Sequence, residues 1–136
     1  MMPDREKVIS GLAALIGASH VITDDAMMAP YLTDWRKRYT GQALCVVRPS
    51  TTNEVIAVMR FAKEHALAIV PQGGNTGLVG GSVPLGRGDE ILLSFQRMNR
   101  IRAIDSSSDT VIVEAGATLA ALQDKAEEVG RLFPLS

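Results

Sequence analysis

The feature that most constrains this chain is a glycine-rich segment, PQGGNTGLVGGSVP, at residues 71–84. Glycines at positions 73, 74, 77, 80 and 81 let the backbone adopt positive φ angles and approach another group closely. Asn75 stands among them, and asparagine also tolerates the left-handed region. Successive N–H groups that such residues turn inward form a nest for an anion. The segment is therefore a candidate phosphate-binding loop, to which Asn75 and Thr76 would add side-chain donors.

The residues before the loop predict the strand from which it leaves. Leu44–Val47 and Leu67–Val70 are short apolar runs typical of buried strands. Thr51 and Glu54 have capping-box spacing, and the helix that begins there ends near His65. One face of this helix is predicted to carry Val55, Val58, Met59 and Ala62. Strand, helix and strand in this order predict a βαβ unit with parallel strands, and ligands bind at the carboxyl ends of such strands.

Two common phosphate motifs do not fit the loop. It contains neither a G-x-G-x-x-G that leads into a helix nor a G-x-x-x-x-G-K-[ST] with its lysine. A flexible surface loop is the other explanation for so many glycines. Leu78, Val79 and Val83, with almost no charge nearby, favour a segment that packs against something. The residues alone leave both explanations open.

The rest of the chain predicts further elements on both sides of this unit. Helices are expected over Pro3–Ile16, with Val8, Leu12, Leu15 and Ile16 on one face, and from Asp24 to Pro30, followed by a loop to Gly41. A third strand is expected at Ile91–Leu93, and then a hairpin of Ile101–Ile104 with Thr110–Val113. Thr118 can cap a last helix with Leu119, Leu122, Ala126 and Val129 on its buried side. This ending leaves an unfinished sheet, so we expect the front part of a larger protein.

Composition excludes several classes of function. The net charge is −1, without the clustered positive charge that nucleic acids require. No apolar stretch approaches the roughly 20 residues of a membrane span, and the chain opens without a secretory signal, so the cytoplasm is the expected location. Cys45 is expected to be a core residue, and no metal site is predicted. Asp105, Asp109 and Glu114 are interpreted as solvated turn residues.

The loop, followed by DEILLSFQRMNRI and VEAGATLAAL, resembles the N-terminal half of the FAD-binding domain of the vanillyl-alcohol oxidase superfamily. Within it, the chain is most similar to D-2-hydroxyacid dehydrogenases such as D-2-hydroxyglutarate dehydrogenase, D-lactate dehydrogenase and the glycolate oxidase FAD subunit. YLTDWRKRYTG ahead of ALCVVRPSTTNEV strengthens this comparison. The resemblance implies an α+β fold: a βαβ subdomain with parallel strands, then the start of a second, mixed or antiparallel subdomain. Residues 1–42 would be N-terminal helices and lead-in, and residues 43–136 the N-terminal portion of an incomplete FAD-binding domain.

In that superfamily the loop wraps the FAD pyrophosphate with its backbone amides. Carried over, the cofactor-binding residues are Pro71, Gln72, Gly73, Gly74, Asn75, Thr76, Gly77 and Leu78, with Gly81 and Ser82 nearer the flavin and Pro134 near the chain end. Members that tether flavin covalently from this loop use a histidine after the paired glycines, where this chain has Asn75. Because an amide cannot form that link, the resemblance predicts FAD held without a covalent bond.

The implied function is an FAD-dependent oxidoreductase that oxidises a D-2-hydroxy acid of the 2-hydroxyglutarate, lactate or glycolate type by hydride transfer to the flavin. Catalytic residues are expected beyond Ser136, so none is assigned. The expected partners are the hydroxy acid, an electron acceptor of unknown kind, and a second copy in a homodimer of the full-length protein. The alternatives are another FAD-linked oxidase or reductase of the superfamily and a non-catalytic nucleotide- or anion-binding module.

Overall fold

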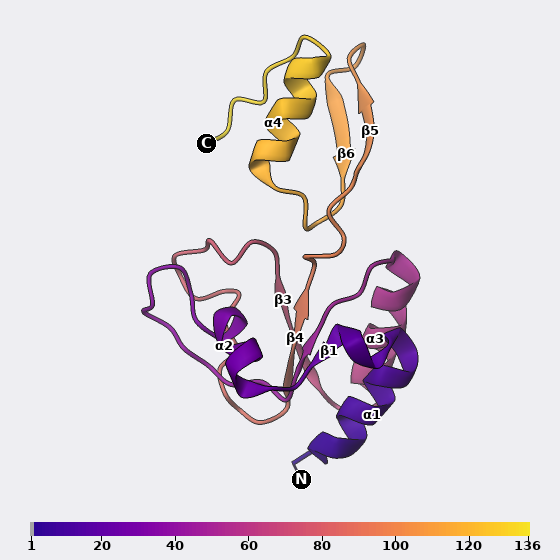
Figure 1. The fold of residues 1–136 in the computed structure, drawn as a ribbon, viewed down its shortest axis with the longest axis vertical. Coiled ribbons are helices and arrows are strands. Elements are labelled where there is room, and N and C mark those ends of the chain that lie inside the picture. The colour runs from indigo at the N-terminus through magenta and orange to yellow at the C-terminus, as the bar shows by residue number, and fades with distance from the viewer. Residues whose placement is uncertain (1) are drawn as a thin grey trace.

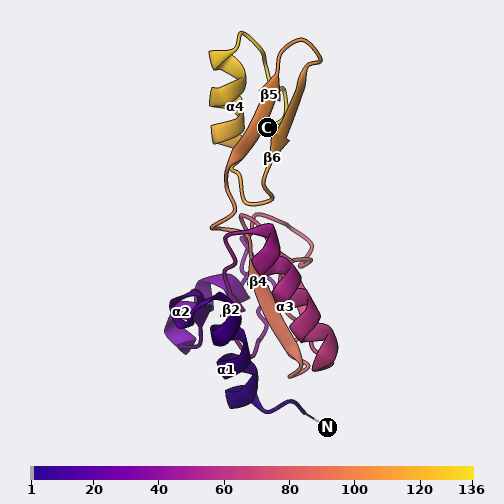
Figure 2. The same ribbon diagram turned by 90° about the vertical axis from the view of Figure 1, so that its right-hand side faces the viewer.

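The computed structural model describes residues 2–136, which form two lobes joined by a short linker (Figure 1, Figure 2). The N-terminus lies at the far end of the first lobe, and the C-terminus lies on the second. The elements of the first lobe are α1 Arg5–Ile16, the 3₁₀ helix η1 Ala18–His20, β1 Val21–Ile22, α2 Asp25–Leu32, β2 Val46–Val47, α3 Thr52–Glu64, β3 Ala68–Gln72 and β4 Glu90–Ser94. Those of the second lobe are β5 Ile101–Asp105, β6 Thr110–Val113 and α4 Leu119–Glu128.

The first lobe is built on a sheet with strand order β1-β2-β4-β3. Strand β4 lies between β2 and β3 and is parallel to both, whereas β1 pairs with β2 in the antiparallel sense. The predicted βαβ unit of β2, α3 and β3 is present, but β4 separates its two strands. The sequence does not predict β1, because two residues are too few to show a period. The loop of residues 73–84 leaves the carboxyl end of β3, as predicted.

Helices cover both faces of this sheet, which is why its central strands read as continuous apolar runs. Val47, Ile91 and Leu93 face the core formed with α1 and α3, while Val46 and Leu92 point the other way, toward Met28 of α2. Each such side chain contributes about 1.5–3 kcal/mol when it is withdrawn from water. The glycine-rich loop leaves the edge strand β3, which pairs along its whole length with the central strand β4.

The helices agree with their predicted positions, with local exceptions. Asp4, Asp24, Thr51 and Thr118 cap the four α-helices as N-cap residues. The predicted burial of Leu119 is wrong, since its side chain is exposed, and Leu15 and Met59 of the predicted apolar faces are exposed as well. Helix α2 also continues past Pro30 to Leu32. Its last carbonyls have no partners within the helix, and they accept hydrogen bonds from distant residues.

The second lobe is the predicted β5–β6 hairpin with α4 packed beside it. Leu122 and Ala126 of α4 are buried. A cavity of about 270 Å³ remains between the helix, the hairpin and the C-terminal segment. Cys45 is fully buried in the first lobe, where burial raises the pKa of its thiol to about 12, so it is the core residue the sequence predicts. Within residues 2–136 no helix is long and apolar enough to cross a membrane.

Candidate functional site

Two amide side chains fasten the start of the glycine-rich loop to the end of α2. Gln72 is buried, and its Nε2 donates to the carbonyls of Tyr31 at 2.8 Å and Ser82 at 3.0 Å. The Nδ2 of Asn75 donates to the carbonyl of Thr33 at 2.7 Å and, at 3.3 Å, to that of Pro30. These bonds satisfy carbonyls that the end of a helix leaves without partners. The loop is therefore fastened at Gln72, Asn75 and Ser82, which argues against the flexible-loop explanation.

Asn75 has a second task inside the loop. Its Oδ1 accepts the Ser82 hydroxyl at 2.9 Å, so the side chain ties the two ends of the loop together. Its backbone is in the left-handed region, with φ 55°. Both hydrogens of the amide are engaged with carbonyls of the protein. The amide therefore holds the loop in place, and the donation of this side chain to phosphate oxygens stays a prediction.

The backbone of the loop, by contrast, keeps its donors free. Within the described chain, no N–H from Gly73 to Ser82 donates to a protein acceptor. The glycines also leave space: a Cβ added at Gly77 or Gly81 would meet nothing within 4 Å. A run of free N–H groups in a segment with little side-chain bulk is the arrangement that binds a phosphate group. This geometry supports the anion nest predicted from the sequence.

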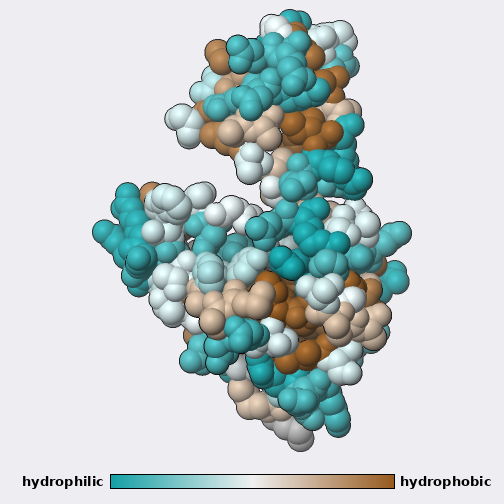
Figure 3. Space-filling model, in the orientation of Figure 1, coloured by the Kyte–Doolittle hydropathy of each residue, from teal (hydrophilic) through white to brown (hydrophobic). Residues whose placement is uncertain are grey.

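A cavity of about 640 Å³ opens between this loop and the second lobe. In the space-filling view the surface is hollowed between the two lobes (Figure 3). The lining comes from α2, from the ends of β1, β2, β3 and β4, from the start of the loop, from the linker before β5 and from the segment before α4: Ile22, Met27, Pro30, Tyr31, Arg48, Gln72, Gly73, Gly74, Asn75, Ser94, Gln96, Asn99, Gly116 and Thr118. Such a volume suits a bound small molecule or a large part of a dinucleotide.

Arg48 is the one charged side chain among the described residues that line this cavity. One of its terminal nitrogens, Nη2, donates to the carbonyl of Ser19 at 3.3 Å, while Nε is buried without a hydrogen-bond partner. A guanidinium in a cavity free of carboxylates favours an anionic ligand. The sequence analysis missed Arg48. The signal was available, because Arg48 follows a predicted parallel strand at the edge where ligands bind.

The wall opposite the loop is formed by the segment between β6 and α4. Gly116 donates its N–H to the carbonyl of Met98 at 2.8 Å, and a Cβ at this position would lie 1.9 Å from the carbonyl oxygen of Phe95. Only glycine fits so close to the linker. A Cβ at Gly73 would lie 3.6 Å from the carbonyl oxygen of Ala115, so the two walls approach each other there.

Glu114 begins this wall, and its predicted role as a solvated turn residue is wrong. Its side chain is 0% exposed and forms ion pairs with Arg100 and Arg102. The hydrogen bonds from the Arg100 guanidinium foremost, and then those from the Arg100 N–H and Arg102, hold the pKa of Glu114 at about 2. The sequence shows only a glutamate at the end of a strand, so no local pattern reveals the burial.

The predicted cofactor-binding residues occupy three kinds of position. Gln72, Gly73, Gly74 and Asn75 line the cavity. Further along the loop, Thr76, Gly77, Leu78 and Gly81 are exposed, and Ser82 is half-buried. Pro71 is exposed within β3, and Pro134 lies exposed in the C-terminal segment of the second lobe, outside the cavity lining. Among residues 2–136, no group of three histidines, cysteines or carboxylates could hold a metal ion.

Residues 43–136, which include the loop and most of the cavity lining, match the family described as FAD binding domain. The chain belongs to this family. FAD is therefore the cofactor of the domain, as predicted. The chain is similar to the mitochondrial D-2-hydroxyglutarate dehydrogenase of Bos taurus, with 41% identity over 126 residues that make up 91% of this chain and 23% of that protein. It is also similar to the mitochondrial D-2-hydroxyglutarate dehydrogenase of Arabidopsis thaliana, at 36% identity over 95% of this chain and 23% of that protein.

Solved structures confirm the predicted α+β fold. The structure of p-cresol methylhydroxylase with substrate bound is similar with a TM-score of 0.77 and 25% identity, over 92% of this chain and 25% of that one. An alkyldihydroxyacetonephosphate synthase has a TM-score of 0.82 at 17% identity, over 95% of this chain and 26% of that one, which supports the fold alone. The chain thus spans about a quarter of the length of the proteins to which it is similar.

The predicted cytoplasmic location is contradicted by the curated relatives. The proteins from Bos taurus and Arabidopsis thaliana are both named as mitochondrial. The prediction depended on the lack of an apolar secretory signal. That criterion detects the secretory route only, because mitochondrial transit peptides are amphipathic and rich in arginine rather than apolar.

Proposed function

We propose that the protein containing this chain binds FAD without a covalent bond and oxidises a D-2-hydroxy acid, with D-2-hydroxyglutarate as the first substrate to test. The observation that supports it most directly is the run of free N–H groups from Gly73 to Ser82. These groups lie beside a cavity in which Arg48 is the one charged side chain among the described lining residues. The names of the relatives from Bos taurus and Arabidopsis thaliana supply the substrate class. Asn75 supports non-covalent binding, since an amide held by Thr33 and Ser82 offers no nucleophile.

The residues present fit the diphosphate of FAD. The loop amides would bind the phosphate oxygens, and Arg48 would offset part of their negative charge. Gly77 and Gly81 leave room for the cofactor to approach the backbone. Thr76 and Leu78 of the exposed part of the loop, together with Pro71 and Pro134, complete the proposed contacts. In this proposal residues 1–42 are the lead-in and residues 43–136 the first portion of the FAD-binding domain.

FAD, when bound, accepts a hydride from the carbon that carries the substrate hydroxyl. The task of this chain is to bind and orient the cofactor and to exclude water from its diphosphate. The fixed positions of Gln72 and Asn75 serve this task, because an anchored loop has little ordering entropy left to lose on binding. The electron acceptor and a homodimer of the full-length protein remain parts of the proposal.

The first test is the visible spectrum of the full-length protein, which should show oxidised-flavin bands at about 370 and 450 nm. Acid precipitation should leave the yellow colour in the supernatant, and D-2-hydroxyglutarate should bleach the bands under anaerobic conditions. D-lactate, glycolate and the L-enantiomers form the comparison set. A protein purified without flavin that also fails to bind added FAD contradicts the proposal. A flavin that stays with the precipitate contradicts non-covalent binding.

Arg48→Gln tests the binding mode. Loss of a charge-assisted interaction of about 1.5–3 kcal/mol should weaken FAD binding by roughly 10- to 150-fold. The matched control is Arg60→Gln, which removes an exposed arginine of α3 outside the cavity lining and should leave affinity unchanged. Equal affinities of wild type and Arg48→Gln would show that Arg48 does not contact the phosphates.

A further inference from the structure

The two walls of the cavity belong to different lobes, and few contacts set their separation. Among the described elements, no helix or strand of the first lobe packs broadly against one of the second. In the ribbon view the lobes meet only around the linker between β4 and β5 (Figure 1). Gly73 and Gly74 stand on one wall, and Gly116 and Thr118 stand on the other. Whatever fixes the angle between the lobes therefore fixes the width of the cavity.

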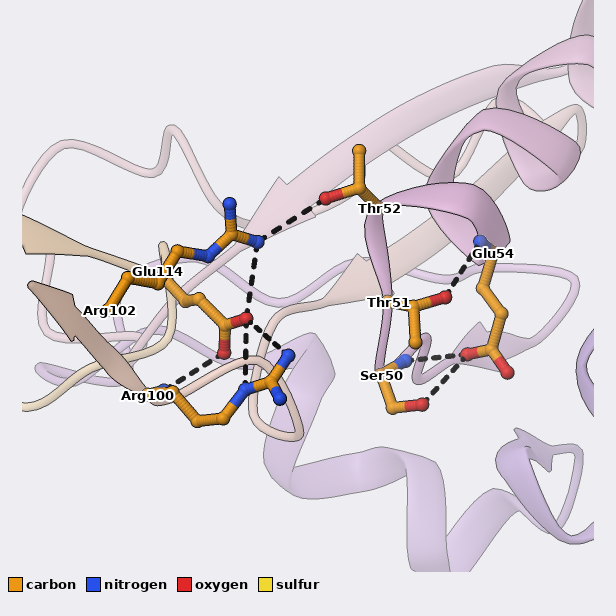
Figure 4. A network of polar contacts seen from close by, with 7 residues as sticks. All are labelled: Ser50, Thr51, Thr52, Glu54, Arg100, Arg102 and Glu114. Carbon is orange, nitrogen blue, oxygen red and sulfur yellow. Dashed lines mark hydrogen bonds and ion pairs between the residues drawn. The ribbon is translucent and has the colours of Figure 1, made fainter.

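A polar network lies at this junction (Figure 4). The Oε2 of Glu114 accepts the backbone N–H of Arg100 at 2.9 Å, and its Oε1 accepts the Arg100 guanidinium at 2.9 and 3.2 Å. The same Oε1 accepts Nη2 of Arg102 at 3.3 Å, and that nitrogen also donates to the hydroxyl of Thr52 at 3.4 Å. Thr52 is the first residue of α3, so the network reaches from the second lobe to a helix of the first.

The backbone of Glu114 belongs to the same junction. Its N–H donates to the carbonyl of Arg100 at 2.9 Å, and its carbonyl accepts the N–H of Ala117 at 3.0 Å. Side chain and backbone together fix the segment that carries Gly116 against the end of the linker. Because a buried carboxylate without its partners is strongly unfavourable, Glu114 favours conformations that keep Arg100 and Arg102 beside it.

We propose that Glu114 is a positioning residue that sets the spacing of the two walls of the cofactor cavity. The identity of the ligand rests on the proposed function, whereas the effect on the spacing does not. Glu114 lies outside the cavity lining and acts through two routes: Arg102 holds the second lobe to α3, and the segment after Glu114 carries Gly116. Without the carboxylate, the lobes sample a wider range of angles, and only a fraction of the molecules presents both walls at the productive distance.

The test measures the distance between the lobes directly. Spin labels at Lys63 of α3 and Glu127 of α4, both exposed helical positions, report this distance in the full-length protein, with and without FAD. We expect a narrow distribution for the wild type and a broader one for Glu114→Ala. If a tenth of the variant molecules keeps the productive spacing, the apparent Kd for FAD rises about tenfold. Glu114→Gln, which keeps one of the two acceptor oxygens and loses the charge, should be intermediate.

A matched control separates this role from general stability. Arg131→Gln breaks the ion pair between Arg131 Nε and Asp109 Oδ1, which are 2.6 Å apart. Both residues belong to the second lobe. It should change neither the distance distribution nor the affinity for FAD. A Glu114→Ala variant that melts earlier but keeps the wild-type distribution and affinity would overturn the proposal. If that variant does not fold, Arg102→Gln removes the bonds of the Arg102 guanidinium to Glu114 and Thr52, and it should broaden the distribution of distances between the lobes.

The two proposals fail in different ways. If the wild type binds no FAD, the proposed function is lost, while the distance measurement still decides the role of Glu114. If the wild type binds FAD and both Glu114→Ala and Arg102→Gln match its distances and affinity, the positioning role is lost and the function stands.

Discussion

Removal of the Asn75 side chain should release the glycine-rich loop from α2 without altering the core. Asn75→Ala deletes the bonds to the carbonyls of Thr33 and Pro30 and the acceptor for the Ser82 hydroxyl. Each such bond contributes about 0.5–1.5 kcal/mol, and the 3.3 Å bond to Pro30 is the weakest, so the three together contribute about 2 kcal/mol. Alanine at φ 55° adds about 1 kcal/mol of backbone strain.

The strain can be separated from the lost bonds. Asn75→Gly loses the same bonds but adopts positive φ freely, so it should cost about 2 kcal/mol where Asn75→Ala costs about 3 kcal/mol. If the whole free-energy loss appears in FAD binding, the affinity falls by at most about 30-fold for Asn75→Gly and about 150-fold for Asn75→Ala. Ser82→Ala, which loses one bond, should have the smallest effect of the three.

The assay is titration of the cofactor-free, full-length protein with FAD, followed by flavin fluorescence or calorimetry. Asn53→Ala, an exposed change in the first turn of α3, serves as the control for altered surface polarity and should match the wild type. The reasoning is refuted if Asn75→Gly binds FAD as tightly as the wild type. It is also refuted if Ala and Gly at this position are equivalent, since the strain would then be absent.

Three further results are expected. A Cβ at Gly41 would lie 1.8 Å from the carbonyl oxygen of Pro84, so Gly41→Ala should destabilise the protein by about 1–3 kcal/mol. A Cβ at Gly77 would meet nothing within 4 Å, so Gly77→Ala should keep the wild-type melting temperature while it weakens FAD binding. The folded-state pKa of Glu114 is about 2, below its ordinary value of 4.5, so its stabilising effect is complete above about pH 4.5 and declines as the pH falls toward 2. The difference in melting temperature between wild type and Glu114→Gln should shrink over that interval, and a constant difference would exclude titration of this carboxyl. Cys45 is fully buried with a thiol pKa of about 12, so a thiol reagent at pH 8 should modify it only at the rate of unfolding; rapid labelling of the native protein at this position, detected by peptide mass analysis, would contradict this burial.

The elements of the fold could be predicted because their signals are local. The Thr51 cap, the apolar run at Leu67–Val70 and the hairpin turn after Asp105 each depend on neighbouring residues alone. The order of the strands could not be predicted. Strand β4 lies between β2 and β3 through pairings with strands that are distant in the chain, and no pattern within Ile91–Leu93 specifies these partners.

The candidate site also has a part that the sequence predicts and a part that it does not. The glycines of the loop and its start at the end of a parallel strand could be predicted, since both follow from the chain itself. The partners of Asn75 could not, because Pro30 and Thr33 lie more than forty positions earlier in the chain. Glu114 was misassigned for the same reason: Arg100 is its partner through a hairpin register that only the folded strands define.

In the glycine-rich loop, side chains hold the loop to the protein, whereas backbone N–H groups are free to bind a ligand. This division explains which residues the loop requires. The amides of Gln72 and Asn75 point into the protein and hold the loop, which leaves the N–H groups after Gln72 for a ligand. Phosphate recognition by backbone does not depend on side-chain identity. Changes at the exposed Val79 that preserve the backbone should therefore be tolerated, whereas a change at Gln72 or Asn75, whose side chains fasten the loop to the protein, should impair binding.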